Sequence, residues 1–289
     1  MNTALIAGVD IGGTHITASL VDLYRGAIIS GSMIRKAVQS QEAPATIIDT
    51  WASAIGSVLD NHAIPLHQRR IGIAMPGPVD YVSGICYIKG QGKYDQLYGL
   101  NIKELLAAQL GIPSSHIRMM NDALCFLKGE IAGGAGKGAG SALGLTLGTG
   151  LGSAWSHEGK IVDADLWRMP YKGVIAEDLL SSRWFVQRYA LQSGKELANT
   201  RQLVDLLPRD PSIAEIFDEF AMQLADFIEA VLPAHPSELI VLGGNIAKSH
   251  RLFLPLLKST LQEKNITVPV RIAMLGEDAH IVGAAANWS

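Results

Sequence analysis

The chain has 289 residues, of which 48% are hydrophobic and 18% are charged, and its formal net charge is -3. This length suits two lobes of ordinary domain size, and the composition is neither that of a disordered chain nor that of a repeat protein. The net negative charge disfavours a general nucleic-acid binder, because such proteins usually carry a basic face.

Two cysteines, Cys86 and Cys125, are too few for a disulfide framework, and they lack the spacing of a zinc site. The first residues, MNTALIAGVDIGG, have no positively charged region and run directly into an apolar segment, which disfavours a signal peptide. No apolar run reaches the roughly 18 residues that a membrane helix needs. We therefore expect a reduced, cytoplasmic protein with no membrane partner.

The first half of the chain alternates strand and helix patterns. Residues 4–22 contain two apolar segments around Gly12-Gly13, and the second segment alternates apolar with polar residues, which predicts a β-hairpin. Apolar residues at helical spacing predict an amphipathic helix over residues 45–59. The other expected elements are strands at 27–34, 70–80 and 117–120, and helices at 102–110 and from 123 onward.

The second half repeats the opening pattern and then becomes mainly helical. Residues 142–156, after a glycine-rich stretch, again contain an apolar strand, a Gly/Thr turn and an apolar strand, which indicates one hairpin duplicated in two lobes. Further helices are expected at 176–191, 213–232 and 251–264, strands at 238–244 and 268–272, and a small-residue helix at the end. We predict one α/β lobe from residues 1–120 and 277–289, and a second from residues 121–276.

Three glycine turns follow three apolar strands, with the sequences DIGGT at 10–14, LGTGLG at 147–152 and LGGN at 242–245. Backbone amides at such turns can approach phosphate oxygens closely, because no Cβ stands in the way. Thr14 and Thr149 add hydroxyl donors beside these amides. Each turn alone is weak evidence, since any one could be a simple hairpin turn. The three in this order predict a phosphate-binding protein.

Acidic residues accompany these turns at two places. Asp10 ends a strand beside the first turn, where a carboxylate can hold Mg²⁺ through water. Asn121-Asp122 lies between a short strand and a helix, which is where open α/β sheets place ligands. A carboxylate there can take the proton from a hydroxyl that attacks a γ-phosphoryl group. The pair would also suit a helix cap, but the neighbouring phosphate turns favour catalysis.

These motifs make the chain similar to the ROK family of bacterial sugar kinases and sugar-responsive repressors. The segments that carry the resemblance are DIGGTHITASLVD at 10–22, GIAMPGPVD at 72–80, MNDALCFLKGE at 120–130, LTLGTGLGSA at 145–154 and IVLGGNIA at 240–247. They occur in the family's order over nearly the whole chain. The resemblance implies a two-lobed actin/hexokinase-type α/β fold with mixed sheets. It also implies an ATP-dependent kinase that phosphorylates a hydroxyl of a sugar or sugar derivative.

The resemblance further implies roles for individual residues. Asp122 would be the general base, and Asn121 would bind a sugar hydroxyl. The residues that would bind the nucleotide are Gly12, Gly13 and Thr14 in the first turn, Thr149 and Gly150 in the second, and Gly243 and Gly244 beside the adenosine. ATP and Mg²⁺ are the implied cofactors, a small sugar is the implied substrate, and a homodimer is expected because family members are often dimers.

The family's repressors carry an additional N-terminal winged-helix domain, whereas this chain begins close to its first expected strand. We therefore expect the kinase branch and no nucleic-acid partner. The second hypothesis is a catalytically weak relative that senses a sugar or a nucleotide. A carboxylate phosphotransferase of the same fold is disfavoured, because an ionised nucleophile would not need a base at Asp122.

The chain departs from the family in the segment that contacts the sugar. Family members usually have Glu-x-Gly-His there, and the His often binds a structural zinc, whereas this chain reads Asp165-Leu-Trp-Arg168. No cysteine follows Cys125, so we expect no zinc at this site. Glu177 takes the place of the family's next sugar-binding glutamate.

Two roles stay open for Arg168. Its planar guanidinium group could anchor an acidic or phosphorylated sugar, because it binds carboxylates and phosphates in a fork. Alternatively, it could pair with Asp165 and adjust a pocket for a neutral sugar. Lys89 and Lys93 bring further positive charge near this end of the site, although such lysines are more often solvated.

Overall fold

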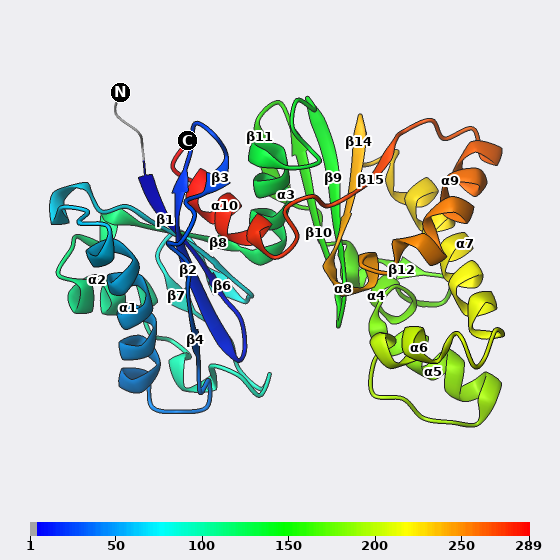
Figure 1. Cartoon of the computed structure of the whole chain (residues 1–289), viewed down its shortest axis with the longest axis horizontal. Helices are drawn as coiled ribbons and strands as arrows, with labels where there is room; N and C mark the ends of the chain where they lie inside the picture. The colour runs from blue at the N-terminus through cyan, green and yellow to red at the C-terminus, as the bar shows by residue number, and fades with distance from the viewer. Residues whose placement is uncertain (1–4) are drawn as a thin grey trace. The chain divides into compact units, whose positions relative to one another are not determined.

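The computed structural model describes residues 5–289 as a mixed α/β chain with two compact units (Figure 1). The first unit runs to Lys137 and takes up Glu277–Ser289, and the second unit is Gly138–Gly276. Ala4, where the first strand was expected to begin, lies outside the described residues. The predicted α/β class with mixed sheets is confirmed. Across the described range, no helix combines the length and the apolar character needed to cross a bilayer.

The first unit contains a six-stranded mixed sheet with the order β3-β2-β1-β5-β8, in which β4 also pairs with β2. The strands are β1 (Leu5–Ile11), β2 (His15–Asp22), β3 (Ala27–Ile28), β4 (Ile34–Ala37), β5 (Ile71–Met75) and β8 (Ile117–Asn121). β1 and β2 are antiparallel with Ile11 opposite Ile16, so the first glycine turn joins them. β5 and β8 run parallel to β1, so the carboxyl ends of all three strands share one edge.

Helices cover both faces of this sheet. α1 (Pro44–Asn61) and α2 (Ile102–Leu110) lie on one face, and α3 (Asp122–Gly133) and α10 (Asp278–Ala286) lie on the other. Ala7, Val9 and Ile11 of β1 belong to the core that includes α1 and α2. Gly8 faces the other way, since side chains alternate along a strand, and a Cβ there would lie 2.2 Å from the Ile281 carbonyl oxygen of α10. Helix α10, red in Figure 1, therefore packs on the blue strand β1.

The second unit has a five-stranded sheet with the order β11-β10-β9-β14-β15. The strands are β9 (Ser141–Leu147), β10 (Leu151–His157), β11 (Lys160–Asp163), β14 (Leu239–Gly243) and β15 (Val270–Ile272). β9 and β10 are antiparallel with Leu147 opposite Leu151, and β14 is parallel to β9. Two longer helices, α7 (Ile213–Val231) and α9 (Leu254–Glu263), pack their apolar residues into this unit's core.

The remaining elements complete both units. They are β6 (Val79–Asp80), β7 (Ile85–Cys86), β12 (Pro170–Tyr171), β13 (Val174–Ile175), α4 (Ala176–Leu179), α5 (Ser182–Ser193), α6 (Thr200–Leu206) and α8 (Gly244–Ala247). The small strands form two separate two-stranded pairs, β6 with β7 and β12 with β13.

Several elements differ from the sequence-based predictions. The helix expected at 176–191 is two helices, because the Ser182 amide donates to the Gly148 carbonyl at 2.7 Å instead of continuing the helix. The strand expected at 27–34 is the separate strands β3 and β4. The strand expected at 70–80 ends at Met75, before the Pro-Gly-Pro sequence that removes ladder donors. The first unit extends past residue 120 to Lys137, because α3 packs against α10 within it.

Candidate functional site

The turn between β1 and β2 carries the first predicted phosphate-binding group. The Gly12 amide donates to the His15 carbonyl at 2.9 Å, and the Val38 amide donates to the Thr14 carbonyl at 2.8 Å. Thr14 is exposed, and its Oγ1 lies 2.9 Å from Nδ1 of His15. These two backbone hydrogen bonds fix the shape of the turn and keep the Thr14 hydroxyl at the surface.

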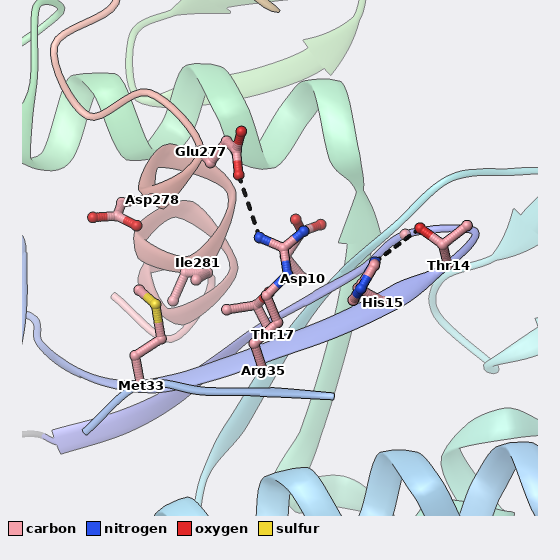
Figure 2. A pocket seen from close by; sticks show the side chains of 10 residues that line it. Asp10, Thr14, His15, Thr17, Met33, Arg35, Glu277, Asp278 and Ile281 are labelled. Carbon is pink, nitrogen blue, oxygen red and sulfur yellow. Dashed lines mark hydrogen bonds and ion pairs between the residues drawn. The ribbon is translucent and has the colours of Figure 1, made fainter. Parts of the chain in front are cut away.

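Asp10 precedes this turn and lines a pocket of about 150 Å³ within the first unit (Figure 2). Arg35 extends into the same pocket from β4 and forms an ion pair with Glu277 at 3.7 Å. Burial raises the pKa of the Asp10 carboxyl, His280 opposes that shift, and the negative charge of Asp122 adds to it. A dication beside these carboxylates would reduce the cost of keeping Asp10 ionised.

Asn121 ends β8 and Asp122 begins α3, so both lie at the carboxyl edge of the sheet that β1 shares, with β5 between β8 and β1. The Oδ1 atoms of Asn121 and Asp122 each accept a hydrogen bond from the Ala123 amide at 2.9 Å. The pair therefore does cap α3, and the positive end of the helix dipole favours a carboxylate there. No hydrogen bond in the described part of the chain engages Oδ2 of Asp122, which is thus able to accept a proton.

Asn121 is held by a second contact. Its Nδ2 donates to the hydroxyl oxygen of Tyr81 at 3.3 Å, and that hydroxyl donates to the Met75 carbonyl at 3.0 Å. The amide of Asn121 is therefore oriented from β5 as well as from α3. This arrangement fixes the two predicted substrate ligands at the carboxyl edge of the sheet.

In the second unit, the β9–β10 turn contains Thr149 and Gly150. The Oε2 atom of Glu177 accepts a hydrogen bond from the Leu151 amide at 3.1 Å, and a Cβ on Gly150 would lie 2.5 Å from that oxygen. Arg183 lies 3.8 Å from the other carboxylate oxygen of Glu177. Glu177 therefore braces the second glycine turn, and its assignment as a sugar ligand stays a prediction.

The third glycine turn packs on the second one. Gly244 has φ +83°, and a Cβ there would lie 2.3 Å from the Leu147 carbonyl oxygen. Only glycine suits both the left-handed backbone and this close approach. Gly243 is buried at the end of β14, opposite Thr146 of β9. The two turns are thus neighbours within the second unit.

A pocket of about 900 Å³ lies within the second unit and is reached from both turns by Thr149 and Asn245. Its lining includes an apolar wall of Val186, Ala198 and Val204. It also includes three cationic side chains, Arg183, Arg201 and Lys248. An apolar wall suits a flat heterocyclic base, and cations suit phosphates. Such a lining is compatible with a nucleotide.

Thr200 lines this pocket and was not identified from the sequence. Its side chain is only 7% exposed, and its Oγ1 has no hydrogen-bond partner among the residues that the structure describes. A buried hydroxyl without a partner is costly, and a small shift that opens it to the pocket would let a ligand atom satisfy it. The available sequence signal was the spacing of Asn199 and Gln202, which is typical of a helix start. The Gln202 amide donates to Oδ1 of Asn199 at 3.1 Å, so Asn199 caps α6.

Asp165 precedes a short 3-10 helix, Leu166–Arg168, and its side chain forms an ion pair with Arg168 at the end of that helix. Of the two arrangements that the sequence left open, the structure contains this internal pairing. The Arg168 side chain is still 66% exposed. The assignment of both residues to a sugar site stays a prediction.

Within residues 5–289, no cluster of three or more His, Cys, Asp or Glu side chains is arranged to hold a metal ion. Mg²⁺ does not need such a cluster, because it keeps several waters and is bound through one or two carboxylates and substrate phosphates. Asp10 fits that kind of site, and the negative charge of the Asp122 carboxylate helps to raise the pKa of Asp10.

Residues 6–164 of the chain match the model of the ROK family. The chain belongs to the ROK family. This result confirms the family predicted from the sequence.

Solved ROK structures cover nearly the whole chain. An inorganic polyphosphate/ATP-glucomannokinase from Arthrobacter sp. strain KM is 27% identical, with a TM-score of 0.71 over 98% of this chain and 97% of that one. A glucokinase from Streptomyces griseus, in complex with glucose and AMPPNP, is 22% identical, with a TM-score of 0.76 over 97% and 98%. A transcriptional regulator, a homologue of the E. coli MLC protein, is 16% identical, with a TM-score of 0.75 over 98% of this chain and 77% of that one. Kinases and regulators of the family thus share this fold.

Proposed function

We propose that this ROK protein is a sugar kinase that transfers the γ-phosphoryl group of ATP to a sugar hydroxyl. The observation that carries the proposal is the position of Asp122. One carboxylate oxygen is fixed at the start of α3 and the other is free of hydrogen bonds in residues 5–289, at the same sheet edge as Asp10 and the first glycine turn. The similarity to kinases over nearly the whole chain supports the same conclusion.

In this proposal, Oδ2 of Asp122 takes the proton from the attacking sugar hydroxyl, and Asn121 orients that hydroxyl through its side-chain amide. The turn at Gly12, Gly13 and Thr14 binds phosphate oxygens through the Gly13 and Thr14 amides and the Thr14 hydroxyl, since the Gly12 amide already donates to the His15 carbonyl. When bound, Mg²⁺ would neutralise phosphate charge, and Asp10 would hold it through water. Positioning and charge neutralisation then account for most of the remaining catalysis.

The second unit supplies the groups for the nucleotide. Thr149 and Gly150 offer a hydroxyl and an amide to the phosphates, and Gly243 and Gly244 would lie against the adenosine. The pocket beside these turns would hold the base against its apolar wall, with the Thr200 hydroxyl as a hydrogen-bond partner. Its cations would face the phosphates.

The sugar is proposed to be neutral. The Asp165 carboxylate already neutralises the guanidinium group of Arg168, which would otherwise attract an acidic or phosphorylated sugar. The second candidate function is a sugar- or nucleotide-sensing protein without turnover. The similarity to a family regulator and the altered segment at 165–168 are the observations that favour it.

A coupled ADP-release assay with neutral, amino, acidic and phosphorylated sugars tests the proposal. We expect turnover with at least one neutral sugar and none with the acidic sugars. Inorganic polyphosphate in place of ATP tests the donor in the same assay. Clear binding of ATP or sugar without turnover on any sugar of the panel would contradict the kinase and favour the sensor.

Replacement of Thr200 by Val should raise the KM for ATP about fivefold with little change in kcat, because the near-isosteric side chain loses about 1 kcal/mol of hydrogen bonding. Thr200→Ser keeps the hydroxyl and is expected to stay within about twofold of the wild type. Initial rates at varied ATP concentration measure both variants. An unchanged KM in Thr200→Val would exclude this hydroxyl from nucleotide binding.

A further inference from the structure

A buried tyrosine fastens the segment around residue 93 to the first glycine turn. The hydroxyl of Tyr94 donates to the Gly12 carbonyl at 2.5 Å, and its amide donates to the Ser40 carbonyl at 2.8 Å. Its ring is fully buried and packs edge-on against Trp51, with ring centroids 5.2 Å apart. Burial raises the pKa of the Tyr94 hydroxyl, which therefore stays neutral and able to donate.

Lys93 directly precedes Tyr94, and its side chain contacts the glycine turn. The position that a Cβ would take on Gly13 lies 3.4 Å from Cδ of Lys93, so the aliphatic stem packs against the turn. On the other side, Gln41 Nε2 donates to the Gly92 carbonyl. Both neighbours of Lys93 are thus held, and its ammonium group, two bonds beyond Cδ, is kept close to the turn.

The other cations nearby are engaged elsewhere. Arg35 pairs with Glu277, and the ammonium group of Lys89 lies over the Tyr98 ring at 5.0 Å from its centroid. Lys93 is half-buried and has neither an ion pair nor a side-chain hydrogen bond in the described structure. An ammonium group without a partner, carried by a half-buried residue beside a turn whose amides suit phosphate, is arranged for an anionic ligand.

We propose that Lys93 is a further catalytic residue, whose ammonium group binds the phosphoryl group in transfer at the Gly12–Thr14 turn. The inference rests on the proposed kinase function. The bond from the sugar oxygen to phosphorus forms as the bond from phosphorus to the bridging oxygen of ADP breaks, and the hydroxyl proton goes to Asp122. Lys93 stays protonated throughout and stabilises the charge on the phosphoryl oxygens.

Lys93→Met tests this role, because methionine keeps an unbranched stem against Gly13 without the charge. We expect kcat to fall about 100-fold, as for the loss of one preorganised donor, while the KM for the sugar changes less than about twofold. Lys89→Met removes a charge from the same segment and should leave kcat within about twofold. Equal kcat values in Lys93→Met and the wild type would overturn the proposal.

A chemical rescue separates the charge from a structural effect. Lys93→Cys should be as slow as Lys93→Met, and alkylation with 2-bromoethylamine, which restores a side chain ending in an ammonium group, should recover most of kcat. The native cysteines, Cys86 and Cys125, are both buried and should react slowly. Alkylated Lys93→Cys that folds like the wild type but stays slow would contradict the role of the charge.

Binding of nucleotides keeps the test independent of turnover. Calorimetry should show Lys93→Met binding AMPPNP about tenfold more weakly than the wild type, with ADP affinity unchanged, because only AMPPNP carries the γ-phosphate. Equal losses for both nucleotides, or none, would overturn the proposal. A wild-type protein without turnover on any sugar contradicts the kinase function, whereas the AMPPNP and ADP affinities still decide the role of Lys93.

Discussion

Replacement of Asp122 by Asn should lower kcat about a thousandfold, in the range expected for loss of a general base. The fold should be unaffected, because Asn retains an Oδ1 that can accept the Ala123 amide, which now bonds to Asp122 at 2.9 Å. The substitution replaces the second carboxylate oxygen with the NH₂ group of the amide, which cannot take a proton. The KM values for sugar and ATP should change much less than kcat, and initial rates with the best sugar of the panel measure all three.

Asp210→Asn is the matched control, since it changes a carboxylate whose Oδ1 accepts a hydrogen bond from Ser212 Oγ at 2.6 Å in a turn. Its kcat should equal that of the wild type. Turnover that persisted in Asp122→Asn would mean that another group is the base. A drop in kcat together with a lower melting temperature would assign the effect to the cap of α3 instead.

Replacement of Gly283 by Ala should destabilise the first unit by about 3 kcal/mol, at the upper end for overpacking. A Cβ on Gly283 would lie 1.8 Å from the Cys125 carbonyl oxygen of α3, which is backbone and cannot rotate away. Helix α10 would have to move off both α3 and the sheet. The melting temperature should fall by roughly 10 °C, measured by circular dichroism.

Gly56 provides the control, because it also lies inside a helix, α1, but a Cβ there would meet only side chains at ordinary contact distances, Leu110 at 3.7 Å and Asp60 at 4.0 Å. Gly56→Ala should therefore stabilise the protein by about 0.5–1 kcal/mol through higher helix propensity. Equal melting temperatures for Gly283→Ala and Gly56→Ala would mean that α10 does not pack closely on α3.

Local patterns predicted the parts of the site that depend on neighbouring residues. The hairpin around Gly12 and Gly13 and the strand-to-helix junction at Asn121-Asp122 were expected from strand alternation and turn residues, and both elements are present. The break between α4 and α5 was not expected, because it follows from a bond between Ser182 and Gly148, which are far apart in sequence.

The contacts of Lys93 and Thr200 were also beyond local patterns. Lys93 was noted only for its charge, since its place on the glycine turn depends on the bond between Tyr94 and Gly12, 82 residues apart. Apolar residues at helical spacing follow Thr200, namely Leu203, Val204 and Leu207, but a threonine at the first position does not by itself indicate burial. Its burial depends on how α6 packs against its neighbours. Tertiary packing, which leaves little trace in a short sequence window, decides both.

The place of α10 also constrains the order in which the chain can fold during synthesis. Residues 277–289 complete the first unit, where Trp288 Nε1 donates to the Ile71 carbonyl at 3.0 Å and Arg118 lies 4.1 Å from the Trp288 ring centroid. The ribosome produces these residues only after the whole of Gly138–Gly276. The second unit is continuous in sequence and can therefore form its core first. The strands of the first unit are synthesised earlier but lack α10 until synthesis ends, so chaperones can bind them in the interval.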